Sequence, residues 1–78
     1  MPDEKRYASI AVHEMRTMYL RLAEDFEQHA AASEELARVH EEAGITGIHP
    51  SVSTLRDRAQ RARDQAAECR EAAAKILA

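Results

Sequence analysis

His13 and Glu14 stand side by side in the stretch VHEMRTM at positions 12–18, and Thr17 follows one helical turn after Glu14. An imidazole changes its charge nearer to neutral pH than other unperturbed side chains, so an accessible histidine can exchange protons or act as a nucleophile. The face of the helix on which these side chains lie decides between a chemical site and a polar patch.

The helical period places His13 away from the apolar side of its segment. At 100° per residue, His13 lies about 200° around the helix from Ala11, which shares an apolar stripe with Leu22. We therefore predict that His13 is exposed and that Glu14 and Thr17 border the same strip.

Metal binding is the other chemistry that histidine suggests, because the chain has four histidines. Helical chelation requires ligands three or four residues apart, whereas His13, His29 and His40 are separated by about 24 Å and about 16 Å along one helix. The Glu-x-x-His pairs of di-iron bundles are absent. We expect no cofactor and interpret His29 and His40 as core or interface residues. A metal site shared by two chains is the weaker alternative.

Length and composition limit the possible functions. A domain of 78 residues buries only about 60% of the surface of its unfolded chain, so a second copy would add needed stability. The single cysteine, Cys69, cannot form an internal disulfide, which favours a reducing cytoplasm, and we expect it to be buried. No apolar run approaches the roughly 20 residues of a membrane span. A net charge of −3 argues against nucleic acid as the main partner.

Helix-breaking residues cluster only in GITGIHP at 44–50. We therefore predict one all-α domain over 1–78, an antiparallel helical hairpin with helices at about 3–43 and about 51–77. The first helix is longer by about 20 Å at 1.5 Å per residue, so its N-terminal turns overhang the hairpin or fray.

The ends of the predicted turn carry capping residues. Gly44 suits the left-handed position that follows a helix end. Ser51, Ser53 or Thr54 can cap the second helix.

The second helix repeats apolar residues at alternating steps of three and four, which is the pattern of a coiled-coil seam. Alanine dominates this seam, so a partner helix can approach closely but buries little apolar area per turn. We therefore expect the first helix to supply larger side chains. The seam residues assigned to the core or an interface are Leu55, Ala59, Ala62, Ala66, Cys69 and Ile76.

The first helix carries larger residues along one stripe, which is too wide for one thin helix to cover. Two hairpins packed as a four-helix bundle would cover it, and we therefore predict a homodimer. The stripe residues assigned to the core or the dimer interface are Met15, Met18, Leu22, Phe26, His29, Leu36 and His40.

Charges near the turn favour the same hairpin, because acidic residues end the first helix and basic residues begin the second. Acidic residues also interleave with the arginines, so we interpret this surface as a solvated face rather than an RNA-binding one. The charges that the turn brings together are Glu34, Glu35, Glu41 and Glu42 with Arg56, Arg58, Arg61 and Arg63.

HEMRT at 13–17 resembles the phosphoacceptor motif, or H-box, of sensor histidine kinases, commonly written His-Glu-Leu-Arg-Thr-Pro-Leu. That motif lies on the first helix of a dimerising helical hairpin, which is similar to the architecture predicted above. The resemblance implies that His13 accepts a phosphoryl group, that Glu14 makes its imidazole nucleophilic, and that Thr17 positions water for dephosphorylation.

The sequence also departs from that family. Met18 and Tyr19 replace the proline and leucine that end the motif, although Arg16 matches its arginine. The 78 residues themselves include no ATP-binding domain. The resemblance therefore implies that a phosphoryl group comes from another protein.

These features together predict a small, non-enzymatic dimerisation and protein-interaction module, an adaptor or regulator of a bacterium or phage. Exposed apolar residues near the overhanging start would mark the contact with a protein partner, without membrane or nucleic acid. Phosphotransfer in trans through His13 is the alternative. The residues expected to bind a partner are Tyr7, Ile10, Val12 and Tyr19.

Overall fold

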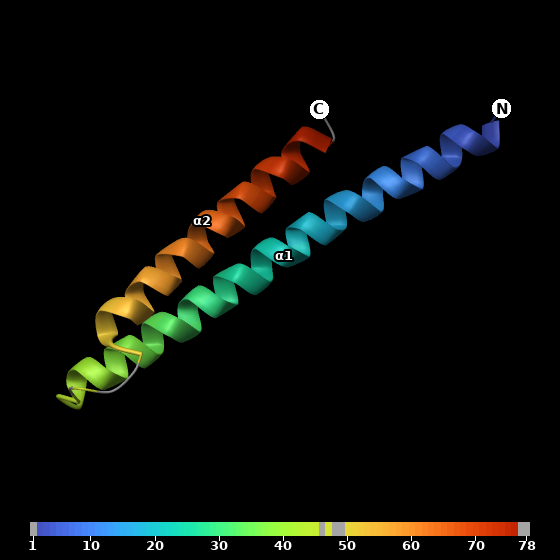
Figure 1. Ribbon diagram of the computed structural model, residues 1–78. Coiled ribbons are helices and arrows are strands. Elements are labelled where there is room, and N and C mark those ends of the chain that lie inside the picture. The colour runs from blue at the N-terminus through green and yellow to red at the C-terminus, as the bar shows by residue number, and fades with distance from the viewer. Residues whose placement is uncertain (1, 46, 48–49, 77–78) are drawn as a thin grey trace.

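The chain folds as two antiparallel α-helices joined by one turn (Figure 1). Helix α1 spans Pro2–Glu42 and helix α2 spans Val52–Ile76, and the described part of the chain contains no strand. The predicted all-α hairpin is confirmed. This computed structural model describes the backbone of residues 2–45, 47 and 50–76, with the side chains of these residues from residue 8 onward.

Both ends of the turn are capped by the predicted residue types. Gly44 has a φ of +65°, and its N–H and that of the next residue donate to carbonyls of the last helical turn at 3.1 and 3.0 Å. These two bonds form a Schellman motif, which satisfies carbonyls that α1 leaves free. At the start of α2, the backbone N–H of Thr54 donates to Oγ of Ser51 at 3.2 Å, so Ser51 is the cap.

The two helices meet along an alanine seam. Its alanines are at most 3% exposed, and on each helix the main row recurs every seven residues. Small side chains on both faces allow the two backbones to approach closely. The buried residues that form the alanine seam are Ala23, Ala30, Ser33 and Ala37 of α1 and Leu55, Ala59, Ala62, Ala66 and Ala73 of α2.

The expectation that α1 supplies larger side chains to this seam is wrong. Alanines on α2 bring the backbones so close that α1 also presents small residues, and its bulky side chains lie to one side. These bulky residues do not belong to the hairpin core, and their place in a dimer interface stays a prediction. The exposed ones are Met15, Met18, Leu22 and Leu36, while Phe26 is half-buried.

Ion pairs follow one edge of the hairpin in a single register. In each pair the two residue numbers add up to 97, and successive pairs are seven residues apart on both helices. A constant sum is the mark of antiparallel helices that keep one alignment along their length. The pairs of this ion-pair ladder are Glu27 with Arg70, Glu34 with Arg63, and Glu41 with Arg56.

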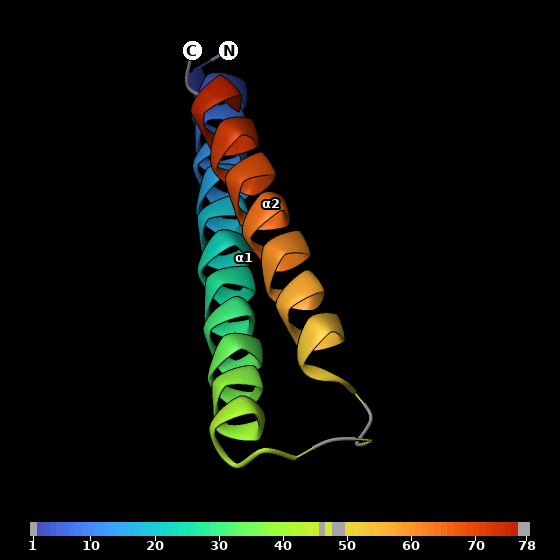
Figure 2. The ribbon, with the colours of Figure 1, turned by 90° about the vertical axis from the view of Figure 1, so that its left-hand side faces the viewer.

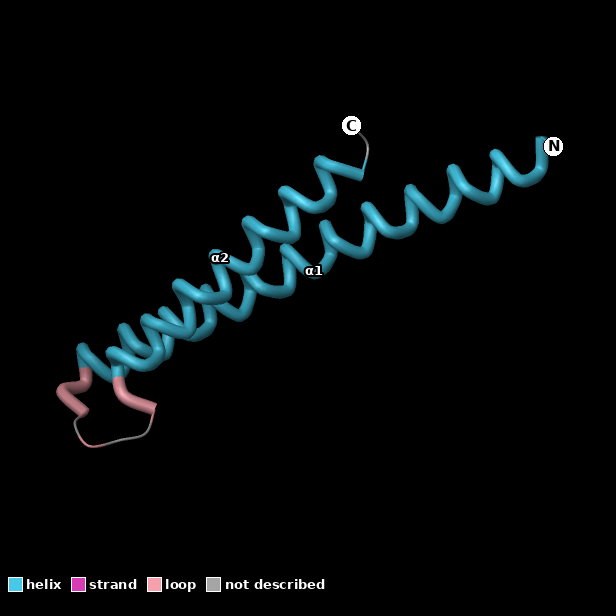
Figure 3. The backbone as a smooth tube through the Cα atoms, turned by 45° about the horizontal axis from the view of Figure 1, so that its top comes forward, coloured by secondary structure: helices cyan, strands magenta, loops and turns pink. Residues whose placement is uncertain are grey.

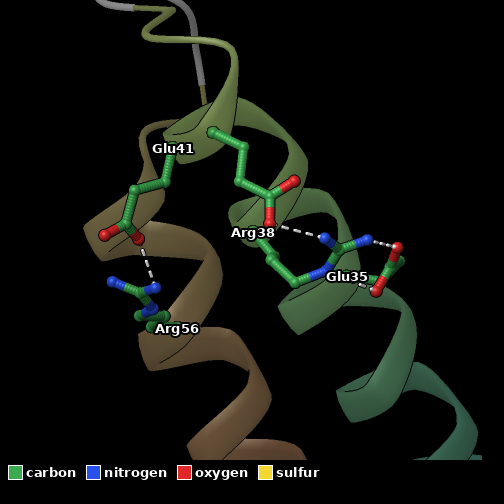
Figure 4. A network of polar contacts seen from close by, with 5 residues as sticks. Glu35, Arg38, Glu41 and Arg56 are labelled. Carbon is green, nitrogen blue, oxygen red and sulfur yellow. Dashed lines mark hydrogen bonds and ion pairs between the residues drawn. The ribbon is translucent and has the colours of Figure 1, made fainter.

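Some charged residues near the turn pair across the two helices, whereas others pair within α1. Figure 4 shows Glu41 facing Arg56 across the hairpin, as expected for the acidic end of α1 and the basic start of α2. Arg38, which lies on α1 itself, instead binds Glu35 and Glu42, the latter at 2.7 Å. Glu35 and Glu42 therefore stabilise the last turns of α1 rather than the contact with α2.

The ladder should make stability depend on pH. The Arg70 guanidinium that donates to Glu27 lowers the pKa of that carboxyl below its ordinary value of 4.5, and Arg63 lowers the pKa of Glu34 in the same way. A lowered folded-state pKa gives stability that is present above pH 4.5 and lost as the pH falls through the folded value. We expect the thermal midpoint to decrease below about pH 4.5.

A double variant tests this origin of the pH dependence. Glu27→Gln with Glu34→Gln should flatten the decrease of the midpoint in acid, as measured by circular dichroism, because both amides are uncharged at every pH. Glu14→Gln with Glu68→Gln removes the same number of charges from exposed positions outside the ladder. Equal flattening in both variants would assign the effect to net charge instead.

Helix α1 extends well beyond the end of α2 (Figures 1 and 3). By the register of the ladder, Ile76 of α2 lies level with Arg21 of α1. The α1 residues 2–20, here called the overhang, therefore have no α2 beside them, which confirms the overhang expected from the helix lengths. The helices are inclined to each other rather than strictly parallel (Figure 2).

Candidate functional site

A second apolar row runs along α1 on a face that α2 leaves uncovered. Met18 is 51% exposed and Leu22 is 38% exposed, although both are large apolar side chains. The row steps by three and four residues, so α1 carries a second coiled-coil seam beside its alanines. This outer seam consists of Met15, Met18, Leu22, Asp25, His29, Ala32, Leu36 and Val39, all of them exposed.

The two edges of the hairpin differ. The ion-pair ladder closes one edge, where each glutamate bridges to an arginine of the other helix. The other edge holds an open groove that combines apolar side chains of α1 with basic and amide groups of α2. Its lining residues are Leu22, Asp25, Phe26, His29, Arg58, Arg61, Ala62 and Gln65.

His13 is exposed, as predicted, and it lies on the overhang. It shares one shallow groove along α1 with Glu14 and Thr17, so the structure brings the three predicted polar residues together. The same groove includes Met18 and Leu22 of the outer seam. His13 is therefore bordered by apolar side chains, a neighbourhood that the angle from Ala11 alone did not indicate.

Arg16 lies seven residues before Ala23, so it continues the row of buried alanines on α1. Ala23 is the alanine of that row nearest the end of α2. Its side chain is half-buried, and its Nε is buried without a hydrogen-bond partner among the described residues. The arginine that matches the H-box motif thus lies on the same face of α1 as the buried alanines, apart from the exposed strip of His13.

The residues expected to bind a partner divide into two groups. Ile10 is 48% exposed, whereas Val12 and Tyr19 are half-buried, and the side chain of Tyr7 lies outside the described residues. Ile10 also lines the groove that contains His13. An exposed apolar contact in the overhang therefore centres on Ile10.

The histidines predicted to lie in the core or an interface differ in exposure. His29 is exposed and His40 is half-buried, and no three His, Cys, Asp or Glu side chains in the described part of the chain are placed to share a metal ion. Cys69 is half-buried rather than buried, with a free thiol, and Ile76 is also half-buried. Among the described residues, no helix is both long and apolar enough to cross a membrane.

Sequence reasoning missed two features that had a signal. The packing face of α1 is marked by alanine at positions 23, 30 and 37, which form a strict seven-residue repeat. The prediction assigned the larger residues of α1 to the core instead. The ladder pair of Glu27 and Arg70 was also missed, although it continues the seven-residue spacing of the two pairs nearer the turn.

Comparison of this chain with known protein families, curated proteins and solved structures finds no match. The outer seam and the groove around His13 must therefore be interpreted from their own chemistry.

Proposed function

We propose that this protein is a non-enzymatic dimerisation module that presents a helical surface to another protein. The observation that carries the proposal is the outer seam, because large apolar side chains lie outside the hairpin while alanines fill its interior. Apart from the buried Leu55, the described core is built of small residues, so a single hairpin gains little from burying it.

A second copy would cover the outer seam and form a four-helix bundle. Complete burial of a side chain such as Leu22 or Met18, now about half exposed, is worth about 1 kcal/mol. Summed over the large seam residues of two chains, this gives on the order of 10 kcal/mol before the cost of association. A Kd of about 1 μM corresponds to about 8 kcal/mol, so a micromolar dimer also requires the other contacts of the bundle to offset the cost of association.

The first turns of the overhang supply a surface for a different protein. Ile10 is exposed near its start, beyond the reach of α2, and single exposed helices of this kind commonly insert into grooves of other proteins. We place the complex in a reducing cytoplasm, because the lone Cys69 has a free thiol.

Sedimentation equilibrium tests the dimer directly. We expect a mass of twice the 8.7 kDa chain at micromolar concentration. A clean monomer over that range would refute the proposal.

Phosphoryl acceptance at His13 is the second candidate function. It is favoured by the exposure of His13 and by the groove that it shares with Glu14 and Thr17. In this reaction an imidazole nitrogen attacks the phosphorus of an acyl phosphate, an N–P bond forms, the P–O bond to the acyl group breaks, and a carboxylate leaves. Glu14 takes up the proton that the imidazole loses.

Mass spectrometry after incubation with acetyl phosphate or a phosphorylated response regulator tests this candidate. The wild type and His29→Ala, which removes another exposed histidine of α1, should carry an acid-labile phosphoryl adduct. His13→Ala should carry none. Absence of any adduct on the wild type would exclude phosphotransfer and leave the dimerisation proposal intact.

A further inference from the structure

We propose that the outer seam of α1 packs against the same seam of a second copy in an antiparallel register that places Asp25 opposite the partner's His29. This inference rests on the proposed function, because it assumes that the protein dimerises. It adds which surface is used, in which direction the two copies run, and which residues meet.

The outer seam contains two rows, each with a period of seven. One row comprises residues 15, 22, 29 and 36, and the other comprises residues 18, 25, 32 and 39. Antiparallel coiled coils build each layer from one residue of either row, and in the register that places Asp25 opposite His29 the numbers in every layer add up to 54. The layers are Met15 with Val39, Met18 with Leu36, Leu22 with Ala32, and Asp25 with His29.

Charge selects this direction. Asp25 and His29 are the two polar residues of the seam and stand at its centre. In a parallel alignment each would face its own copy, and two carboxylates would meet in an apolar interface, which disfavours association. In the antiparallel alignment each carboxylate faces an imidazole.

The groups around this centre fit the same arrangement. Asp25 and His29 are four residues apart on one helix, so they are also neighbours within a chain. Two copies would then form a ring of alternating carboxylates and imidazoles. Arg58 and Arg61 border the same groove from α2 and add positive charge there, which favours the presence of the partner's carboxylate.

Side-chain size agrees with the register. Leu22 lies opposite the small Ala32. In the next layer, the flexible side chain of Met18 lies opposite the branched side chain of Leu36. Alternation of large and small residues across a seam lets the layers interdigitate. Both ends of the seam are apolar, so water is excluded from the charged centre by flanking layers on either side.

The register also accounts for the overhang. A sum of 54 places residues 11–20 beside residues 34–43 of the second copy. The part of α1 that its own α2 does not reach is thus covered by the turn-proximal half of the partner's α1. Only the first turns of α1 project beyond the pair.

Disulfide trapping tests the register. In a Cys69→Ser background, Met18→Cys combined with Leu36→Cys should form a covalent dimer under mild oxidation. These positions are about 27 Å apart within one helix, so they cannot bond within a chain. Leu22→Cys alone should not crosslink, because the two copies of that residue lie about 15 Å apart along the antiparallel pair. A protein that sediments as a dimer but crosslinks through Leu22→Cys alone, or fails to crosslink through the cysteine pair, would overturn the register and leave the proposed function standing.

A charge exchange gives an independent measurement. Asp25→Lys should weaken the dimer by at least about tenfold in Kd, because lysine then faces the partner's His29. Adding His29→Glu should restore most of the affinity, since lysine and glutamate then meet. In a parallel dimer the double variant would place like charges together, so failure of this rescue contradicts the proposal.

Discussion

Replacing Leu22 by aspartate is expected to convert the proposed dimer into monomers while leaving each hairpin folded. Within one chain Leu22 is 38% exposed and lies outside the alanine seam, so the substitution should cost the hairpin little. In the proposed dimer the same position is covered by the partner. A carboxylate there loses the apolar contact and also becomes a charge without a partner in an apolar layer.

Symmetry doubles this effect. Each proposed dimer contains Leu22 twice, and losing about 1 kcal/mol of apolar burial and at least about 1 kcal/mol more through the unpaired charge at each position raises Kd by at least about 100-fold. Sedimentation at several concentrations measures the change, and circular dichroism checks that helix content persists. Gln28→Asp is the matched control, because it adds the same charge to an exposed position of α1 outside the outer seam. If Gln28→Asp dissociates the protein equally, general repulsion is responsible and the outer seam is not the interface.

Replacing Ala66 by leucine is expected to destabilise the hairpin itself. Ala66 is completely buried between the two helices, and by the register it lies almost level with Ala30 of α1. Leucine adds three carbons where the backbones are closest, so the helices must separate or the side chain must adopt a strained rotamer. Overpacking of this kind costs about 1–3 kcal/mol, which is a large part of the stability of so small a domain.

The neighbouring alanine provides the control for this substitution. Ala67→Leu makes the same chemical change one residue away on the exposed face of α2, and the two residue types have similar helix propensities. Chemical denaturation should show a loss for Ala66→Leu and almost none for Ala67→Leu. Equal stability of the two variants would mean that the seam can expand, contrary to its alanine packing.

The sequence is sufficient to predict the two helices and their turn, because the signals are local. Breakers occur together only near Gly44, and both Gly44 and Ser51 act at the positions where their backbone preferences place them. The alanine-rich seam of α2 was predictable for the same reason, since a single heptad pattern dominates that helix.

The packing face of α1 was not predicted, because two seams compete on one helix. Choosing the face with Met18 and Leu22 assumes that larger apolar residues are buried first. The distance between the two helices decides instead which face of α1 is packed. Because α2 presents alanine, only a small residue such as Ala30 fits opposite it. The apolar neighbourhood of His13 was missed for a related reason. The stripe with Met18 and Leu22 was expected to be buried, so it was not expected to border the exposed groove around His13.

The ion-pair ladder has a consequence for how this hairpin can change length. An insertion of one residue within α2 would rotate everything after it by 100° and break the constant sum of the pairs, so the alanines and the arginines would lose their partners together. An insertion of seven residues at matching levels of both helices keeps the alanines and the ion pairs in phase. Changes in the turn alter neither helix. The rod can therefore grow or shrink only in whole heptads, whereas its turn is free to vary residue by residue.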